Sequence, residues 1–433
     1  MKARFIGLVG VALATLVACG DQEVILNGER LDVTGNEPAV AINRAAPLSL
    51  PTPSVNANWT HKNGNTAHFL AHPALQRSLQ PVWSTPIGEG NERKHRITAD
   101  PVVASGRIYT MDSRSLVAAH TASGGTVWTR DITPATENKD DASSGGLAVA
   151  GDTLYVTSGF GFVTALNAAT GAPRWTQSLD AAPMGAPTVQ DGVVFLTTRD
   201  SLGWALDAST GRILWQVFGA TSDSGISGGS APAIAGPLVV FPFPSGQMVS
   251  AVRGTGQQAW AASVAGKRLG RAFSKFTDLS GDPVVAGNVV YAGNHAGSAA
   301  AFDATTGQSL WRADEGALSP VWIAGGSVFL ISDENRLVRL DAATGETIWA
   351  RDLPFFTRER IKRRKGTFAH YGPVLAGGRL LVASDTGALR EFDPVNGNLI
   401  GSTELPSGAA RNPVVAGGTL YLVTENGTLH AFR

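Results

Sequence analysis

Short apolar stretches, each ending at an aspartate or asparagine, recur through most of the chain. Residues 301–311 read Ala-Phe-Asp-Ala-Thr-Thr-Gly-Gln-Ser-Leu-Trp, and close copies occupy residues 165–175, 205–215 and 339–349. An apolar strand that ends at Asp or Asn, a glycine that accepts positive φ, and a tryptophan four residues after it together predict a β-hairpin. We expect each tryptophan to pack between neighbouring sheets.

A second phrase precedes each copy of the first. Residues 100–109 read Asp-Pro-Val-Val-Ala-Ser-Gly-Arg-Ile-Tyr, and residues 282–291 and 412–421 follow the same pattern. The remaining forms begin near Gly146, Ala186, Ala231, Pro320 and Gly372, which makes eight in total. The two phrases together predict eight units of four short strands.

The repeat length identifies the architecture. Successive tryptophan positions lie between 38 residues (Trp311 to Trp349) and 52 residues (Trp349 to Gly401) apart. Helical repeats have similar periods, but these segments are rich in Val, Tyr, Thr and Gly and carry no apolar stripe of 3.6-residue period. The pattern therefore predicts an all-β, eight-bladed β-propeller of four-stranded antiparallel blades over residues 81–433. Gly401 stands where the repeat has tryptophan, so we expect a neighbour to fill that interface.

The two ends of the repeat region complement each other. Residues 427–433 have the pattern of a third strand with no fourth strand after it, whereas residues 83–87 have the pattern of a fourth strand and precede the first complete unit. We therefore expect the N-terminal strand to complete the last blade and close the ring.

The first residues resemble a bacterial lipoprotein signal peptide. A short basic opening is followed by an apolar run over residues 5–17 and then by Leu-Val-Ala-Cys, which ends at Cys19. The run is too short for a membrane-spanning helix of roughly 20 residues but suits a cleaved signal. It predicts a signal peptide over residues 1–18 and lipidation of Cys19 with palmitate-type chains. The alternative is an ordinary signal peptide with an incidental cysteine.

Residues 19–57 contain four prolines and no sustained period, which predicts a lipidated flexible tether. Residues 58–80 contain Trp59, which disfavours an extended linker, so a packed N-terminal flap is expected there. Gly20 follows the cysteine where enterobacterial lipoproteins retained in the inner membrane have Asp. The resemblance thus implies an outer-membrane protein, lipid-anchored on the periplasmic face.

Composition narrows the functional classes. The formal net charge is zero and charged residues make up 16% of the chain, so nothing indicates nucleic-acid binding. The single cysteine excludes a disulfide within the monomer and a cysteine-based metal site. The sequence predicts no metal, no cofactor and no small-molecule substrate. One charge anomaly remains, the basic run of residues 358–365, interpreted either as a solvated loop or as a contact with an acidic partner, lipid headgroups or lipopolysaccharide.

Three short motifs were weighed as chemistry. Residues 225–229 fit G-x-S-x-G around Ser227, but a nucleophile elbow needs a strand followed by a helix, and a loop leading into a strand is predicted here. His68 and His72 would form a metal pair only if the flap were helical. Residues 159–161 read Gly-Phe-Gly, and this is interpreted as a hairpin turn rather than a dinucleotide fingerprint.

The long insertions all connect a fourth strand to the next first strand. They occupy residues 216–230, 264–281 and 354–371. Because strands alternate in direction, these insertions lie on one face of the ring, and that face is the expected working surface.

The lipobox, the eight repeats and closure by the N-terminal strand together resemble the BamB family of lipoproteins of the outer-membrane β-barrel assembly machinery, over about residues 59–433. The resemblance implies a non-enzymatic scaffold of the BAM complex that binds the POTRA region of BamA and other subunits and assists insertion of outer-membrane proteins. Family contacts made by two loops around the fourth blade fall here on Ile226, Ser227, Lys275 and Asp278. Ile226 and Asp278 keep the apolar and acidic character of the family positions, whereas Ser227 stands in place of Arg.

Two other readings stay open. Pyrroloquinoline quinone dehydrogenases share these repeats, although their pattern includes adjacent cysteines that are absent here. The chain is also consistent with a membrane-anchored propeller that binds another envelope polymer or protein.

Overall fold

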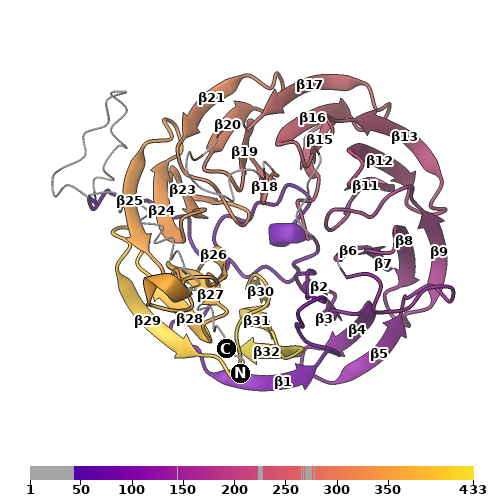
Figure 1. Cartoon of the computed structure of the whole chain (residues 1–433), viewed down its shortest axis with the longest axis horizontal. Coiled ribbons are helices and arrows are strands. Elements are labelled where there is room, and N and C mark those ends of the chain that lie inside the picture. The colour runs from indigo at the N-terminus through magenta and orange to yellow at the C-terminus, as the bar shows by residue number, and fades with distance from the viewer. Residues whose placement is uncertain are drawn as a thin grey trace, which may run out of the picture. The chain divides into compact units, whose positions relative to one another are not determined.

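Figure 1 shows the ring predicted from the repeats. The structure is a computed structural model, and it describes residues 43–433 except 144, 223–227, 265, 267, 269–275 and 277. Eight separate four-stranded antiparallel sheets surround a central axis; in seven of them the strands follow chain order from the inside outwards, and in the eighth the outer strand is β1. The prediction of an eight-bladed β-propeller is confirmed. Among the described residues, no helix is long and apolar enough to cross a membrane.

The first four blades follow one another along the chain. Blade one is β2 (Val102–Ala104), β3 (Arg107–Met111), β4 (Leu116–Thr121) and β5 (Thr126–Asp131); blade two is β6 (Gly145–Ala150), β7 (Thr153–Ser158), β8 (Phe162–Asn167) and β9 (Pro173–Ser178). Blade three is β10 (Thr188–Gln190), β11 (Val193–Thr197), β12 (Leu202–Asp207) and β13 (Ile213–Phe218); blade four is β14 (Ala233–Ala235), β15 (Leu238–Pro242), β16 (Gln247–Val252) and β17 (Gln258–Ser263).

The remaining blades continue the series. Blade five is β18 (Gly281–Ala286), β19 (Val289–Gly293), β20 (Ala299–Asp303) and β21 (Ser309–Ala313); blade six is β22 (Trp322–Ala324), β23 (Ser327–Ile331), β24 (Arg336–Asp341) and β25 (Thr347–Asp352). Blade seven is β26 (His370–Ala376), β27 (Arg379–Ser384), β28 (Ala388–Phe392) and β29 (Leu399–Glu404); blade eight is β30 (Val414–Ala416), β31 (Thr419–Thr424), β32 (Thr428–Phe432) and β1 (Pro81–Pro86). Two short 3₁₀ turns are η1 (Lys62–Gly64) and η3 (Ile361–Arg363).

Closure of the ring occurs as expected. Strand β1 pairs with β32 in antiparallel register, with Trp83 opposite Ala431 and Pro86 opposite Thr428. The backbone amide of Gln80 also donates to the carbonyl of Arg433 at 2.9 Å. The fourth strand of blade eight therefore comes from the beginning of the repeat region, and no blade is left with three strands.

The core lies between the faces of neighbouring blades. Every residue of β7 is buried, while the outermost strands are mostly exposed on one face. In an antiparallel blade the second and third strands are covered on both sides, so they carry almost continuous apolar residues. The outer strands alternate, and this alternation is the pattern visible in the sequence.

Each outer-strand tryptophan joins one blade to the next. The indole N–H of Trp260 donates to the carbonyl of Ala304 at 2.9 Å, and its ring lies against Gly307, where a Cβ would approach the ring to 2.6 Å. Gly307 has φ +72°, which a glycine adopts at no steric cost. The Asp303 carboxylate accepts the amides of Thr305 and Thr306 and so caps the same turn. Equivalent indole bonds are made by Trp83, Trp128, Trp175, Trp215, Trp311 and Trp349.

Gly401 breaks this series for a structural reason. The tryptophan of each blade rests on the turn between the third and fourth strands of the following blade, and blade eight has no such turn because β32 and β1 are not consecutive. The ion pair of Arg379 and Glu391, whose Nε and Oε2 lie 2.6 Å apart, instead lines a hollow of about 420 Å³ beside Gly401, together with residues 77–79 of the N-terminal segment. Arg379 also donates to the carbonyl of Gln76. At this interface the N-terminal segment and the Arg379–Glu391 ion pair therefore lie where the other blades have a tryptophan.

Residues 43–80, called here the N-terminal thread, start beside the outer strand β25, pass through the inside of the ring and lead into β1 (Figure 1). The thread bonds to every blade in turn. Trp59 exchanges two backbone hydrogen bonds with Val103 of blade one. Blades two to eight each donate at least one hydrogen bond to the thread. The donor and acceptor residues are Val149 and Thr60 in blade two, Val189 and His61 in blade three, Ile234 and Thr66 in blade four, Val285 and Ala67 in blade five, Trp322 and Ala71 in blade six, Gly377 and Pro73 and also Gly378 and His72 in blade seven, and Gly417 and Asn56 in blade eight. The donor is the indole N–H in Trp322 and the backbone amide in all the others.

The contacts begin before the expected flap. Asn43 accepts the amide of Ala350 in β25 at 3.0 Å, and the carbonyls of Ala46 and Pro47 accept the guanidinium of Arg339. Residues 43–57 thus contact the propeller, although they lie within the range predicted as a tether. Residues 1–42, which include Cys19, lie outside the described residues, so the signal peptide, the lipidation of Cys19 and the flexible tether up to residue 42 stay predictions.

Candidate functional site

Two loops on one face flank blade four. The first joins β13 to β14 over residues 219–232, and the second joins β17 to β18 over residues 264–280. Three of the residues predicted to meet a partner, Ile226, Ser227 and Lys275, lie outside the described residues, and so does the G-x-S-x-G motif around Ser227. The structure describes Asp278 and the ends of both loops.

The first loop is fixed where it leaves and rejoins the sheet. The amide of Ala220 donates to Oε1 of Gln247 at 2.7 Å, and the amide of Gly229 donates to the carbonyl of Met184 at 2.7 Å. Gly228 has φ +73°, and a Cβ there would lie 3.1 Å from Thr98 across the channel. Both described ends of this loop are therefore held by hydrogen bonds to neighbouring parts of the ring.

The second loop is fixed by a different kind of contact. Arg268 donates through Nε to Oδ2 of Asp333 at 2.7 Å, and its Nη2 lies 3.6 Å from Glu315. Arg336 holds the same Glu315 at 2.6 Å and Glu334 at 3.2 Å. Two guanidinium groups and three carboxylates therefore tie the loop after blade four to blades five and six.

These charges influence each other. Burial lowers the pKa of Arg268, but the hydrogen bond and charge of Asp333 outweigh it, so that its pKa is raised. Burial raises the pKa of Glu315 in spite of Arg336 and Arg268. The network is consistent with an anchor that holds the loop by charge-assisted hydrogen bonds, which are stronger than neutral ones.

Asp278 sits at the base of the second loop. Only 1% of its surface is exposed, and its carbonyl accepts the amide of His295 at 3.1 Å. In this conformation a partner would meet the residues before Asp278 first. Phe276, which is 42% exposed, is the large apolar side chain that the described part of this loop presents to solvent.

The two loops meet at their bases. The hydroxyl of Ser230 donates to the carbonyl of Leu279, and the amide of Ala231 donates to Oδ1 of Asp282 at 2.7 Å. Side chains that are far apart in the sequence thus hold one continuous surface. The spacing of the repeats placed both loops on one face, but it gave no sign of these bonds.

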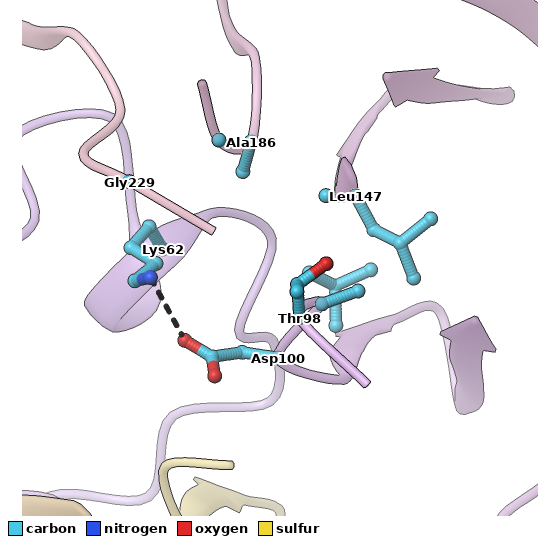
Figure 2. A pocket seen from close by; sticks show the side chains of 10 residues that line it. Lys62, Thr98, Asp100, Leu147, Ala186 and Gly229 are labelled. Carbon is cyan, nitrogen blue, oxygen red and sulfur yellow. Dashed lines mark ion pairs between the residues drawn. The ribbon is translucent and has the colours of Figure 1, made fainter. Parts of the chain in front are cut away.

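A buried charge cluster lies beneath this surface, at the centre of the ring. Figure 2 shows Lys62 of η1 pointing toward Asp100. Its Nζ lies 3.5 Å from Asp100 and 3.6 Å from Asp282, and Nε of Arg411 lies 2.7 Å from Asp100. Burial alone would raise the pKa of Asp100, but Arg411 and Lys62 lower it to about 2. The cavity beside Lys62 has a volume of about 10 Å³, which is space for roughly one water molecule.

The sequence showed half of this cluster. Asp100 and Asp282 begin two of the eight second phrases, so their recurrence was visible. Lys62 carried no repeat signal, because the thread that supplies it is not part of a repeat. Lys62 reaches the two aspartates because the thread carries η1 into the centre of the ring (Figure 1).

His68 and His72, the two histidines considered as a metal pair, bind backbone groups instead. Nδ1 of His68 lies 2.8 Å from the carbonyl of Pro283, and the amide of Gly378 donates to Nε2 of His72 at 2.8 Å. The thread is not helical between them. No group of three or more His, Cys, Asp or Glu among the described residues is arranged to hold a metal ion.

Comparisons with known proteins follow the same ring. The sequence model of the family described as "Outer membrane protein assembly factor BamB" matches residues 113–351 and 358–433. This chain belongs to the BamB family. The protein of that name from Yersinia pestis is 27% identical over 342 residues, which cover 77% of this chain and 84% of the relative.

Solved structures agree on the fold of this BamB-family chain. The crystal structure of BamB from Moraxella catarrhalis aligns with a TM-score of 0.67 at 17% identity and covers 82% of this chain and all of that one. The quinohemoprotein alcohol dehydrogenase from Comamonas testosteroni aligns with the same TM-score at 16% identity, over 87% of this chain and 80% of that one. At such identities the likeness concerns the fold alone, so the sequence match and not the ring separates the two families.

Proposed function

We propose that this protein is a non-enzymatic scaffold subunit of the outer-membrane β-barrel assembly complex, and that it binds the POTRA region of BamA and assists folding and insertion of outer-membrane proteins. The observation that carries the proposal is the BamB family match over most of the propeller. The relatives that match are named outer membrane protein assembly factors.

The geometry supports a docking role for the loops around blade four. A rigid ring holds both loop bases by buried hydrogen bonds, and the Arg268 network ties the second loop to blades five and six. Positioning a partner on such a surface requires preorganised loops, because each side chain or loop ordered on binding costs free energy. Ile226, Ser227 and Lys275 would form the contact surface, with Phe276 beside them, and Asp278 would position the second loop from below.

Strand addition is the binding mode that this architecture favours. The outer strand of each blade has a neighbouring strand on one side only, although β25 of blade six already bonds to residues 43 and 44. A strand of a partner domain would extend one of the other blades through backbone hydrogen bonds while the loops select the partner. Anchoring would come from lipid chains on Cys19, which would hold the protein at the periplasmic face of the outer membrane.

The test is co-purification from outer membranes. Tagged full-length protein would be extracted in detergent, and co-purifying proteins identified by mass spectrometry. Wild type should retain BamA, whereas Ile226→Asp and Lys275→Glu should each reduce the recovered BamA at least tenfold. Leu214→Asp is the matched control, because Leu214 is 49% exposed and lies near the start of β13, at the opposite end of that strand from the first loop.

The co-purification results distinguish an assembly factor from another envelope-binding propeller and from a quinone-dependent dehydrogenase. Loss of BamA in the loop variants with retention in the control would support both the role and the loops. Absence of BamA from folded, lipidated wild type would overturn the proposal in favour of a propeller that binds another envelope component. Retention of a quinone by the purified wild type would overturn the non-enzymatic assignment.

A further inference from the structure

A long hairpin-like loop connects blade six to blade seven. Residues 353–369, called here the basic finger, join β25 to β26. At its base the amide of Phe368 donates to the carbonyl of Phe355 at 2.8 Å, and Thr357 and Gly366 are linked in the same way at 3.0 Å. Nδ2 of Asn335 donates to the carbonyl of Phe368 at 2.9 Å. The projection is therefore a built element with a fixed base.

The tip of the basic finger concentrates positive charge. Residues 358–365 contain six cations and one carboxylate, which gives a net charge of +5 in a chain whose formal net charge is zero. Every one of these residues is exposed. Within the described part of the chain, none of the six cations forms an ion pair. Arg364 instead lies over the ring of Phe356, with 4.8 Å from its Cζ to the ring centroid.

An apolar side chain stands in the middle of these cations. Ile361 opens the 3₁₀ turn η3 and is 81% exposed, more than any other large apolar side chain among the described residues. Leu399 and Ile400 of the neighbouring strand β29 are also more than half exposed. Leu399 and Pro354 of the finger line one groove of about 260 Å³. Cations around an exposed apolar tip are typical of segments that lie in a membrane interface.

The finger projects from the same edge at which the chain enters the ring. Asn43 accepts the amide of Ala350, and the amide of Arg44 donates to the carbonyl of Ile348, both in β25. Strand β25 then continues directly into the finger. If Cys19 is lipidated, residues 20–42 connect the lipid to this edge, and a flexible chain of 23 residues has a root-mean-square span of about 26 Å.

We propose that the basic finger binds the anionic phosphate headgroups of a lipid bilayer, with Ile361 entering the interface. The propeller would then stand with blades six and seven against the membrane and the loops around blade four further from it. The orientation rests on the proposed lipid anchor, whereas the binding step needs only the finger. An acidic protein partner would also attract the cations, but it would not explain an isoleucine exposed at their centre, on the loop that follows the strand to which residues 43 and 44 bond.

Vesicle binding by the lipid-free mature chain tests the binding step. Residues 20–433, made without Cys19, should bind vesicles of phosphatidylcholine with 30 mol% phosphatidylglycerol and not vesicles of phosphatidylcholine alone, and binding should weaken with added salt. A cation near an anionic membrane contributes about fivefold in partitioning, so Arg360→Gln/Lys362→Gln/Arg363→Gln should weaken binding about 100-fold. Ile361→Ser should weaken it about tenfold without changing the salt dependence.

The control removes the same charge elsewhere. Arg93→Gln/Lys94→Gln/Lys139→Gln changes three exposed cations of other loops and should leave binding unchanged. Equal binding by the finger variant and wild type, equal losses in finger and control variants, or no preference for anionic vesicles would each overturn the proposal. These measurements contain no BamA, so their failure is distinguishable from failure of the assembly role.

Fluorescent labels test the orientation. The mature lipid-free chain has no cysteine, because Cys19 is the single cysteine of the sequence. A polarity-sensitive probe on Ile361→Cys should shift to shorter wavelength on anionic vesicles, and the same probe on Leu214→Cys in blade three should not. A blue shift of the probe at position 214, or no shift of the probe at position 361, would overturn the proposed orientation of the propeller on the membrane.

Discussion

The buried cluster around Lys62 allows a quantitative prediction. Lys62→Met keeps much of the volume of the side chain but removes the ammonium group that lies within 3.6 Å of both Asp100 and Asp282. Asp100 keeps Arg411 and the amide of Asn412. Asp282 loses its cation and keeps the backbone amide that it accepts. The variant therefore leaves a carboxylate that is 1% exposed, has no ion-pair partner among the described residues and feels only the more distant charge of Arg411.

Removing one partner from a buried charge network costs about 3–5 kcal/mol. Unfolding entropy is about 2.1 cal/mol/K per residue, and for roughly 390 ordered residues it sums to about 0.8 kcal/mol/K. The expected decrease in Tm is therefore about 4–6 °C. Differential scanning calorimetry at a fixed scan rate, at pH 7.5, would measure it.

Two further variants make the reasoning refutable. Lys62→Met/Asp282→Asn removes the uncompensated charge as well, so it should recover at least half of the lost Tm, since charges in one network are not additive. Lys139→Met removes an exposed lysine and should change Tm by less than 1 °C. If Lys62→Met alone changes Tm by less than 1 °C, or the double variant is less stable than the single one, the cluster does not hold the thread as described.

Three other predictions concern the turns, the thread and pH. Gly307→Ala should lower the free energy of unfolding by about 2–4 kcal/mol, because its Cβ would meet the ring of Trp260. Gly287 also has positive φ, but its Cβ would point into open space, so Gly287→Ala should lower the free energy of unfolding by only about 1–2 kcal/mol. Urea titration of both variants measures the difference. Arg339→Met leaves two thread carbonyls without their donor, so it should cost about 2–4 kcal/mol and speed limited proteolysis near residue 46. Burial lowers the pKa of His370 from 6.5 to about 4, so its neutral form stabilises the fold above pH 6.5, and this contribution is lost as pH falls towards 4. At pH 5 the loss is about 2 kcal/mol, and His370→Asn should reduce the acid-induced drop in Tm.

The ring could be predicted because its determinants are local and repeated. The glycine of each hairpin turn and the tryptophan four residues later encode both the turn and the contact with the neighbouring blade, and six copies of this pair recur along the chain. Even the exception at Gly401 was informative, because the indole is missing where the neighbouring blade has no turn to receive it. Contacts between residues close together in the sequence were therefore sufficient to predict the ring.

The thread and the loop bases could not be predicted for the opposite reason. Thr60 and Ala67 contact the ring through single backbone carbonyls, and a backbone carbonyl is the same in every residue. The bond between Ser230 and Leu279 joins segments about fifty positions apart without any periodic signal. Asp278 was recognised by its acidic character, but its burial depends on the packing of two loops that the sequence does not relate.

The N-terminal thread also has a consequence for the order of folding. Neighbouring blades could assemble in sequence as the chain is made, as in other repeat proteins whose units contact only their neighbours. The thread bonds to blades one to eight, so its complete set of partners exists only when the last blade is in place. The thread is therefore synthesised before every blade but completes its contacts last. Because it bonds to all eight blades, it couples the unfolding of each blade to that of the others.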